Sequence, residues 1–252
     1  MVKKNYQWAD GATLEDHTRR KLKILREYFS DYLAVRCVIP QQERFRLAIV
    51  DGFAGGGRYK CGTAGSPIVF IEVLKEFTEQ IRIKRAAEGM APIVFECLLM
   101  LNDEARDTLE LLKTHVAPLE AAIKESSGNL HLRVEYFNQP FEKAHPEIAA
   151  MLQRGRYSTN VLFNLDQCGH KHVSVTTLLQ IMRSYTSAEI FYTFAIQSLI
   201  SFLEKANAAK FAKQLASLGL SRDDLPFPSC FAKTGLNPRK SVLTRGHPQN
   251  DG

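Results

Sequence analysis

Residues Ala48 to Tyr59, AIVDGFAGGGRY, decide the fold of this chain. They continue an apolar run that begins at Phe45 (FRLAIV), and such a run is typical of a strand buried on both faces. The strand ends in the acid Asp51, and four glycines follow within residues 52–57 (GFAGGG), which we call the glycine loop. Glycines at the carboxyl edge of a sheet let the backbone approach a ligand closely. The stretch therefore predicts a ligand-binding loop, with a tight strand-to-helix turn as the alternative.

The spacing of the glycine loop excludes two common nucleotide motifs. Asp51-x-x-x-Gly55-x-Gly57 is not the G-x-G-x-x-G fingerprint of dinucleotide-binding folds, and no G-K-[ST] follows it. The sequence thus disfavours an NAD-type oxidoreductase and a P-loop nucleotidase.

Apolar runs and amphipathic stretches alternate along the rest of the chain. The repeating order predicts a Rossmann-like, doubly wound, mostly parallel α/β sheet over residues 1–220, followed by a poorly ordered polar tail over 221–252. Thr13 is a candidate N-cap for the first helix, Ser66 before Pro67 for the second, and Pro118 is expected to interrupt the third. We expect strands over residues 45–50, 93–101, 129–137, 160–165 and 189–196, and helices over residues 13–35, 67–85, 104–124, 140–154, 173–185 and 199–218.

Composition indicates an ordinary globular protein. The chain has 252 residues, of which 45% are hydrophobic and 24% charged, and its net charge is +6. The basic excess would suit a polyanionic partner without requiring one. The five cysteines include no C-x-x-C pair, the first residues contain no apolar signal region, and no apolar stretch approaches the roughly 20 residues of a membrane span. We therefore expect a soluble cytoplasmic protein without membrane contact.

The fourth expected strand ends in a second candidate site. Residues 164–173 read NLDQCGHKHV, so Asp166 and Gln167 follow the strand and His170 lies in the loop. If this strand lies beside the first, Asp166 and Asp51 line one crevice. His170 is a candidate substrate contact or a solvated loop residue, and we expect no metal site because no third ligand is evident.

Polar residues also follow the second and third expected strands. Asn102 and Asp103 stand where nucleotide-cofactor enzymes place an acid that binds the ribose, although either is also a good helix N-cap. Asn138 is a candidate adenine contact or a plain turn residue.

Four further residues are candidate substrate contacts. His17 and Lys21 are four residues apart on the first expected helix, so they share a face that could meet an anionic group or simply be solvated. Arg58 and Tyr59 directly follow the glycine loop, and each is either a substrate contact or part of a solvated loop.

The order of five motifs resembles the three-Cys-motif partner protein family (TcmP), over about residues 5 to 205. The motifs are HTxxKLxILxxY (17–28), DGFAGGGRY (51–59), GSPIVFIEV (65–73), LDQCGHKHV (165–173) and YTFAIQSLISFL (192–203). That family is similar to class I S-adenosylmethionine-dependent methyltransferases. The resemblance therefore implies a Rossmann-like fold that binds S-adenosylmethionine against the glycine loop, and a partner that carries the three-Cys motif.

The resemblance assigns roles to individual positions. It places Asp51, Gly52, Phe53, Ala54, Gly55 and Gly57 in the cofactor-binding motif, and Asp166 with Gln167 in the catalytic one. Family carboxylates are missing at four positions. Leu101 stands where a Glu is usual, Gln139 replaces an acid after Asn138, and Gln197 and Ser201 stand where acids are expected near the fifth strand.

Two functions remain open at this stage. The first is a methyltransferase-like enzyme, in which Asp166 and Gln167 orient a nucleophile from the substrate and nucleic acid is the first candidate substrate. The second is a non-catalytic module that binds a three-Cys-motif, radical-SAM-like protein, in a mobile-element or phage-defence setting. The missing carboxylates favour the second function, and binding of S-adenosylmethionine separates the two.

Overall fold

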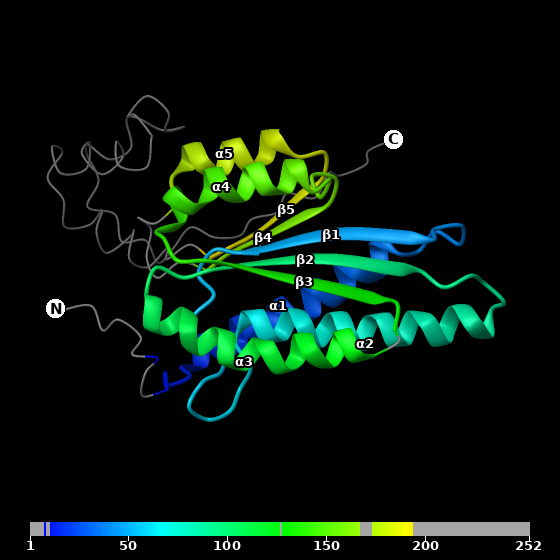
Figure 1. Ribbon diagram of the computed structural model, residues 1–252, viewed down its shortest axis with the longest axis horizontal. Coiled ribbons are helices and arrows are strands. Elements are labelled where there is room, and N and C mark those ends of the chain that lie inside the picture. Colours follow the sequence, from blue (N-terminus) through cyan, green and yellow to red (C-terminus); the bar gives the residue numbers. More distant parts are fainter. Residues whose placement is uncertain (1–7, 9–10, 127, 167–172, 194–252) are drawn as a thin grey trace, which may run out of the picture.

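The computed structural model describes residues 8, 11–126, 128–166 and 173–193. Its centre is a five-stranded sheet in the order β3-β2-β1-β4-β5, in which every pairing is parallel (Figure 1). The strands are β1 (Arg44–Asp51), β2 (Val94–Asn102), β3 (Leu130–Phe137), β4 (Val161–Leu165) and β5 (Ala188–Tyr192). The predicted parallel sheet is confirmed.

Helices cover both faces of the sheet. Figure 1 shows α1 (Asp16–Arg36), α2 (Ser66–Ala87) and α3 (Arg106–Glu125) on one face, and α4 (Phe141–Arg154) and α5 (Val175–Ser184) on the other. This is the two-faced α/β arrangement expected of a Rossmann-like fold. In the described part of the chain, no helix has the length and apolar character needed to cross a membrane.

Alternate side chains of β1 pack into two separate hydrophobic cores. Leu47 and Ile49 belong to the cluster packed under α1, α2 and α3, whereas Ala48 and Val50 belong to the cluster under α4 and α5. All four are at most 1% exposed. Burial on both faces explains why the strand reads as an uninterrupted apolar run.

The two predicted helix caps are wrong. The N-cap of α1 is Glu15 and that of α2 is Gly65, so Thr13 lies outside its helix and Ser66 is the first residue of its own. Tertiary hydrogen bonds determine where both helices begin. The Lys60 N–H donates to the Ala12 carbonyl (3.0 Å), which holds the chain before α1, and the Gly65 N–H donates to the Gly57 carbonyl (2.6 Å), which holds the chain before α2.

Pro118 does not interrupt α3, contrary to expectation. A proline removes the hydrogen bond to the carbonyl four residues earlier, here that of Thr114. Both residues are exposed, so water can bond that carbonyl and the helix continues. The expected helix over 199–218, the tail over 221–252 and the last residues of the expected fifth strand lie outside the described residues.

Arg85 joins α2 to the connection between α1 and β1. Its side chain is 3% exposed, and its guanidinium donates to the carbonyls of Ala91 (2.6 Å), Pro40 (2.6 Å), Gln42 (3.2 Å) and Ile39 (3.3 Å). A planar five-donor group can bond carbonyls in several directions at once, which an ammonium group on a thinner stem cannot reproduce.

Arg85→Lys is therefore expected to lower the free energy of unfolding by about 2 kcal/mol, because a buried cation and its four carbonyl partners lose hydrogen bonds to one another. Urea denaturation measures the change. Arg82→Lys, on the exposed side of the same helix, is the matched control and should shift stability by no more than about 0.5 kcal/mol. Equal losses in the two variants would contradict the assigned role of Arg85.

Candidate functional site

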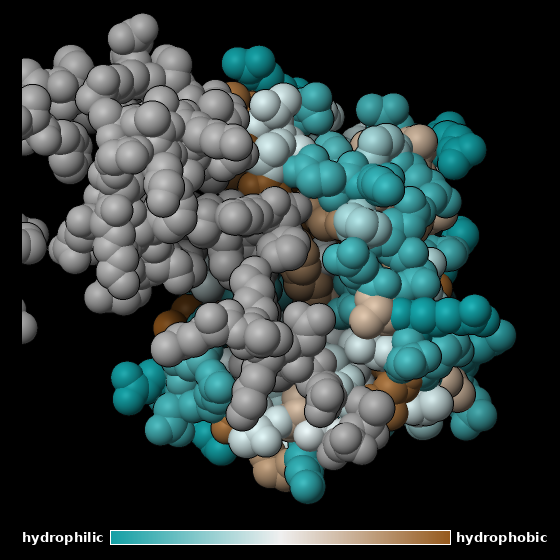
Figure 2. Space-filling view, turned by 90° about the vertical axis from the view of Figure 1, so that its left-hand side faces the viewer, coloured by the Kyte–Doolittle hydropathy of each residue, from teal (hydrophilic) through white to brown (hydrophobic). Residues whose placement is uncertain are grey.

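The candidate site lies at the carboxyl edge of the sheet, where β1 is flanked by β2 and β4. Asp51 is in register with Leu101 on one side and Asn164 on the other. The ends of the first and fourth strands are thus adjacent, as the crevice between Asp51 and Asp166 requires. Figure 2 looks onto this edge, and most of the described surface visible there is hydrophilic.

Asp51 is a fully buried acid at the end of β1. Burial raises its pKa to about 7. Ser66, Asn164 and the Phe53 N–H, which donates to Oδ1 at 3.4 Å, act in the opposite direction and lower the pKa. The nearby charge of Asp166 raises the pKa further. Within the described residues, Oδ2 of Asp51 has no hydrogen-bond partner.

Two buried amides flank this acid. Asn164 and Asn102 are each 1% exposed, and the Oδ1 atom of each has no hydrogen-bond partner within the described residues. The Asn102 Nδ2 donates to the Gly52 carbonyl (3.0 Å), and the Ala54 N–H donates to the Asn102 carbonyl (2.9 Å). The end of β2 therefore holds the first half of the glycine loop in place.

Contacts at the glycine loop leave no room for side chains. Gly55 and Gly57 have φ of +63° and +86°, a region that strains other residues. A Cβ on Gly55 would lie 2.5 Å from Cζ2 of Trp8, and one on Gly56 would lie 2.7 Å from Cε3 of the same indole. Gly52 is closed in by Leu165 and Phe141, at 2.9 Å from its Cβ position. In the structure the indole of Trp8, a residue that the sequence did not single out, lies against the loop.

Asp103 joins the second strand to the glycine loop. Its Oδ2 accepts from the Gly55 N–H (3.1 Å) and its Oδ1 from the Ala105 N–H (2.9 Å). Burial raises the pKa of this carboxyl above its ordinary value. Asp103 therefore turns the chain into α3, close to the cap position that the sequence allowed, and at the same time contacts the loop.

Asn138 supports the same connection from β3. Its Nδ2 donates to the carbonyls of Asp103 (2.9 Å) and Glu104 (3.1 Å). Phe53, the remaining side chain of the predicted cofactor motif, lies against Phe141 with ring centroids 5.9 Å apart.

The structure brings Lys21 to the site but not His17. The Lys21 Nζ donates to Oδ1 (2.7 Å) and Oδ2 (2.6 Å) of Asp166, and both side chains are 28% exposed. His17 lies at the exposed start of the same helix, 3.3 Å from the carboxylate of Glu15. His17 and Lys21 therefore do not form one shared site, because Lys21 turns inward to the end of β4.

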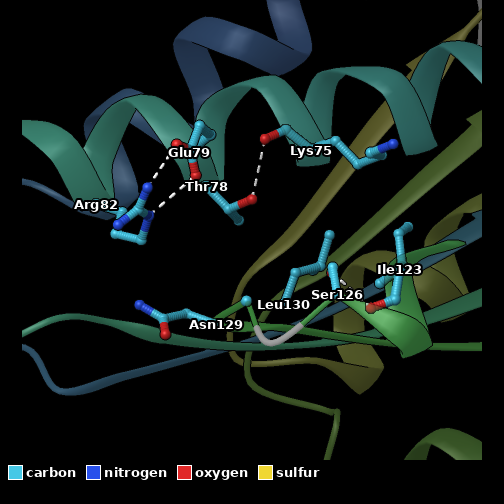
Figure 3. A pocket seen from close by; sticks show the side chains of 9 residues that line it. Lys75, Thr78, Glu79, Arg82, Ile123, Ser126, Asn129 and Leu130 are labelled. Carbon is cyan, nitrogen blue, oxygen red and sulfur yellow. Dashed lines mark hydrogen bonds and ion pairs between the residues drawn. The ribbon is translucent and has the colours of Figure 1, made fainter.

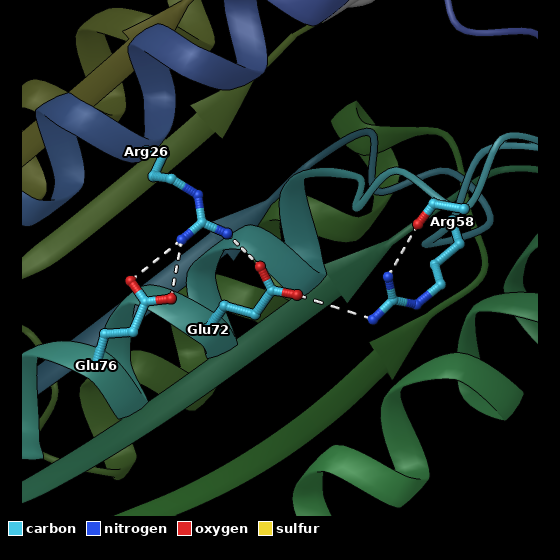
Figure 4. Close-up of polar contacts among 5 residues, drawn as sticks. Arg26, Arg58, Glu72 and Glu76 are labelled. Carbon is cyan, nitrogen blue, oxygen red and sulfur yellow. Dashed lines mark hydrogen bonds and ion pairs between the residues drawn. The ribbon is translucent and has the colours of Figure 1, made fainter.

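Arg58 is held by an ion-pair network. Its guanidinium lies 3.8 Å from Glu72 and donates to the Gly62 carbonyl (3.0 Å), while Arg26 of α1 pairs with Glu72 and with Glu76 (3.2 Å) (Figure 4). Arg58 thus ties the loop after β1 to α2. Tyr59 lies against Trp8 instead, with ring centroids 5.1 Å apart.

Two of the predicted site residues, Gln167 and His170, lie outside the described residues. Three residues at the site, Asn164, Trp8 and His115, were not predicted. Asn164 could have been noticed as a polar residue inside an apolar run, but nothing local marks Trp8 or His115, whose Nδ1 lies 2.7 Å from the Gly56 carbonyl. Both reach the glycine loop only through the tertiary fold.

A separate open hollow of about 440 Å³ lies between α2 and the connection from α3 to β3 (Figure 3). Lys75, Arg82 and Asn129 are among the residues that line it. Its polar groups are partly engaged with one another, since Arg82 pairs with Glu79 and Thr78 bonds the Lys75 carbonyl. It lies towards the amino end of β3, away from the glycine loop.

No group of three or more His, Cys, Asp or Glu side chains in the described ranges is arranged to hold a metal ion. Comparisons with protein-family models, with curated proteins and with solved structures give no match. The geometry of the site is therefore the basis for assigning a function.

Asp51→Asn is expected to gain stability relative to the unchanged protein as pH rises from about 4 to about 7. The folded state binds a proton at Asp51 more tightly than the unfolded chain, so its contribution to stability is present at low pH and is lost as pH rises through about 7. The difference should grow by at most about 1.4 kcal/mol per pH unit and then level off. Urea denaturation at several pH values measures it, and a pH-independent difference would contradict the raised pKa.

Proposed function

We propose that this chain is a methyltransferase-like enzyme that binds S-adenosylmethionine at the carboxyl edge of its sheet. The hydrogen bond between the Gly55 N–H and the Asp103 carboxylate carries the proposal. It sets the acid that follows β2 against the loop that follows β1, and an acid near that strand end accepts from ribose hydroxyls in nucleotide-cofactor enzymes. A carboxylate offers about four lone-pair sites, so Asp103 keeps acceptors for the ribose while it contacts the loop.

The buried acceptors beside β1 also fit this cofactor. Asp51 and Asn164 point to the same face of the sheet, and each has one buried oxygen without a donor in the described part of the chain. Leaving such an oxygen unsatisfied costs about 1–3 kcal/mol, so a donor is expected there. The ammonium group of S-adenosylmethionine carries three N–H donors.

The cofactor, when bound, supplies an electrophilic methyl group, and its transfer requires alignment of the acceptor more than acid or base strength. Asp166 is the residue of the described chain that we assign to orienting the acceptor, together with Gln167. Lys21 contacts both oxygens of Asp166 and keeps that carboxylate in one position at the end of β4. Asp166 retains lone pairs that can accept from a substrate N–H or O–H.

The ion pair between Lys21 and Asp166 also supports the second candidate function, a non-catalytic module. A carboxylate already bonded through both oxygens can serve structure alone, as in a non-catalytic module that binds a three-Cys-motif protein. Such a module would keep the fold without binding S-adenosylmethionine, so cofactor binding separates the two candidates.

Calorimetric titration with S-adenosylmethionine should give saturable binding, and the fluorescence of Trp8, the single tryptophan of the chain, should change in parallel. Gly55→Ala should weaken binding by about tenfold or more, roughly 1.4 kcal/mol, because the new methyl group displaces Trp8 and strains the loop. Gly89→Ala is the matched control. Gly89 has a similar φ of +68° but no atom within 4 Å of its Cβ position, so it carries the same strain far from the site.

Two results would contradict the enzyme proposal. Absence of heat at millimolar S-adenosylmethionine would favour the non-catalytic module. Equal loss of binding in the Gly55 and Gly89 variants would mean that general destabilisation, rather than the loop, governs the result.

A further inference from the structure

Aromatic and basic side chains gather beside the glycine loop, on residues that the cofactor proposal does not use. The ring centroids of Trp8 and Tyr59 are 5.1 Å apart, and both side chains are partly exposed. Lys60 follows Tyr59 directly and is exposed. The backbone connects these groups, because the Lys60 N–H donates to the Ala12 carbonyl and the Gly11 N–H to the Trp8 carbonyl (2.9 Å).

Arg19 of α1 extends this group. Its charge acts on Cys61, whose pKa is lowered chiefly by hydrogen bonds with Thr63 and additionally by Arg19. Arg19 lies in the first turn of α1, which follows Ala12, the residue whose carbonyl accepts from the Lys60 N–H. We call Trp8, Tyr59, Lys60 and Arg19 the aromatic–basic corner.

The local charge favours an anionic partner. Residues 15–23 and 58–63 together hold six Lys and Arg side chains against two acids, Glu15 and Asp16. Lys21 pairs with Asp166, Arg58 with Glu72, and Lys23 lies 3.8 Å from Glu27. No carboxylate of the described ranges forms an ion pair with Arg19 or Lys60, and both are exposed. Their charges are thus available to an external anion.

The indole of Trp8 packs against the glycine loop. Atoms of its six-membered ring lie where Cβ atoms on Gly55 and Gly56 would be, so the ring rests against the loop. Partly exposed aromatic rings next to unpaired cations are the usual means of binding single-stranded nucleic acid, in which bases stack on the rings and phosphates meet the cations.

We propose that the aromatic–basic corner binds single-stranded nucleic acid and presents it to the neighbouring site. The inference rests on the proposed function in one respect, which is that the bound strand is the substrate of the methyltransferase-like enzyme. Binding itself requires no cofactor. A strand that stacks on Trp8 is separated from Gly55 and Gly56 by the indole ring, and Gly55 bonds Asp103, so the strand lies next to the proposed cofactor site.

Fluorescence anisotropy of labelled oligonucleotides tests the proposal on the full-length protein. Their length, about 12 nucleotides, lies within the range that one single-strand-binding surface covers. Arg19→Glu with Lys60→Glu should weaken binding by about tenfold or more at about 50 mM salt and make the salt dependence shallower. Arg154→Glu with Lys143→Glu is the matched control, since it reverses one exposed arginine and one exposed lysine on α4, across the sheet. It should weaken binding less than about twofold. Binding should also quench the fluorescence of Trp8.

Three outcomes would overturn the inference. These are no binding to either DNA or RNA strands, equal losses in the two double variants, or duplex bound as tightly as single strand without quenching. Calorimetry with S-adenosylmethionine is run on the same preparations. Saturable heat without oligonucleotide binding would reject the aromatic–basic corner and leave the cofactor proposal intact, whereas the reverse would reject the cofactor proposal and leave nucleic-acid binding.

Discussion

The parallel pairing of β1 with both β2 and β4 determines where everything else in this molecule lies. β1 pairs with β2 from Arg44 to Asp51 and with β4 over its last four residues. The chain therefore builds one half of the sheet beyond β2 and the other half beyond β4, with helices on opposite faces. At such a point the connections diverge and leave a crevice beyond the strand ends. The glycine loop, Asp103 and Asp166 meet there because each follows one of these three strands.

Three of the buried side-chain oxygens without a hydrogen-bond partner in the described residues lie at this same edge, on Asp51, Asn102 and Asn164. Gly55 and Gly57 are left-handed, Asp51 is a buried acid, and Asn164 keeps a buried oxygen without a donor in the described chain. The buried guanidinium of Arg85 differs, because it donates to four carbonyl partners. Buried oxygens without a donor are rare in native structures. Those of Asp51 and Asn164 lie where the proposed cofactor would donate hydrogen bonds, which supports that proposal.

The sequence predicted the five strands closely, because a strand buried on both faces shows as an apolar run bounded by polar residues. It also predicted which strand ends carry acids, since a parallel sheet brings those ends to one edge. It failed where tertiary contacts overrule local signals. Gly65 is held by Gly57, so the cap at Ser66 does not form, and Lys21 turns away from His17 because Asp166 attracts it. Trp8 lies more than 40 residues from the loop that it covers, and no periodicity reveals such a contact.

The ion pairs around the site separate its two proposed tasks. Glu72 holds Arg58 and Asp166 holds Lys21, so these two cations position the loop after β1 and the end of β4. Arg19 and Lys60 lack such carboxylate partners in the described chain, and both are exposed on the outer side of this edge, where Lys60 follows Tyr59. The inner side offers buried acceptors and close backbone, which suit a small molecule with N–H and O–H donors. The outer side offers rings and free positive charge, which suit a strand of phosphates and bases. Trp8 joins the two sides, because its indole lies against Gly55 and Gly56 and also next to the ring of Tyr59.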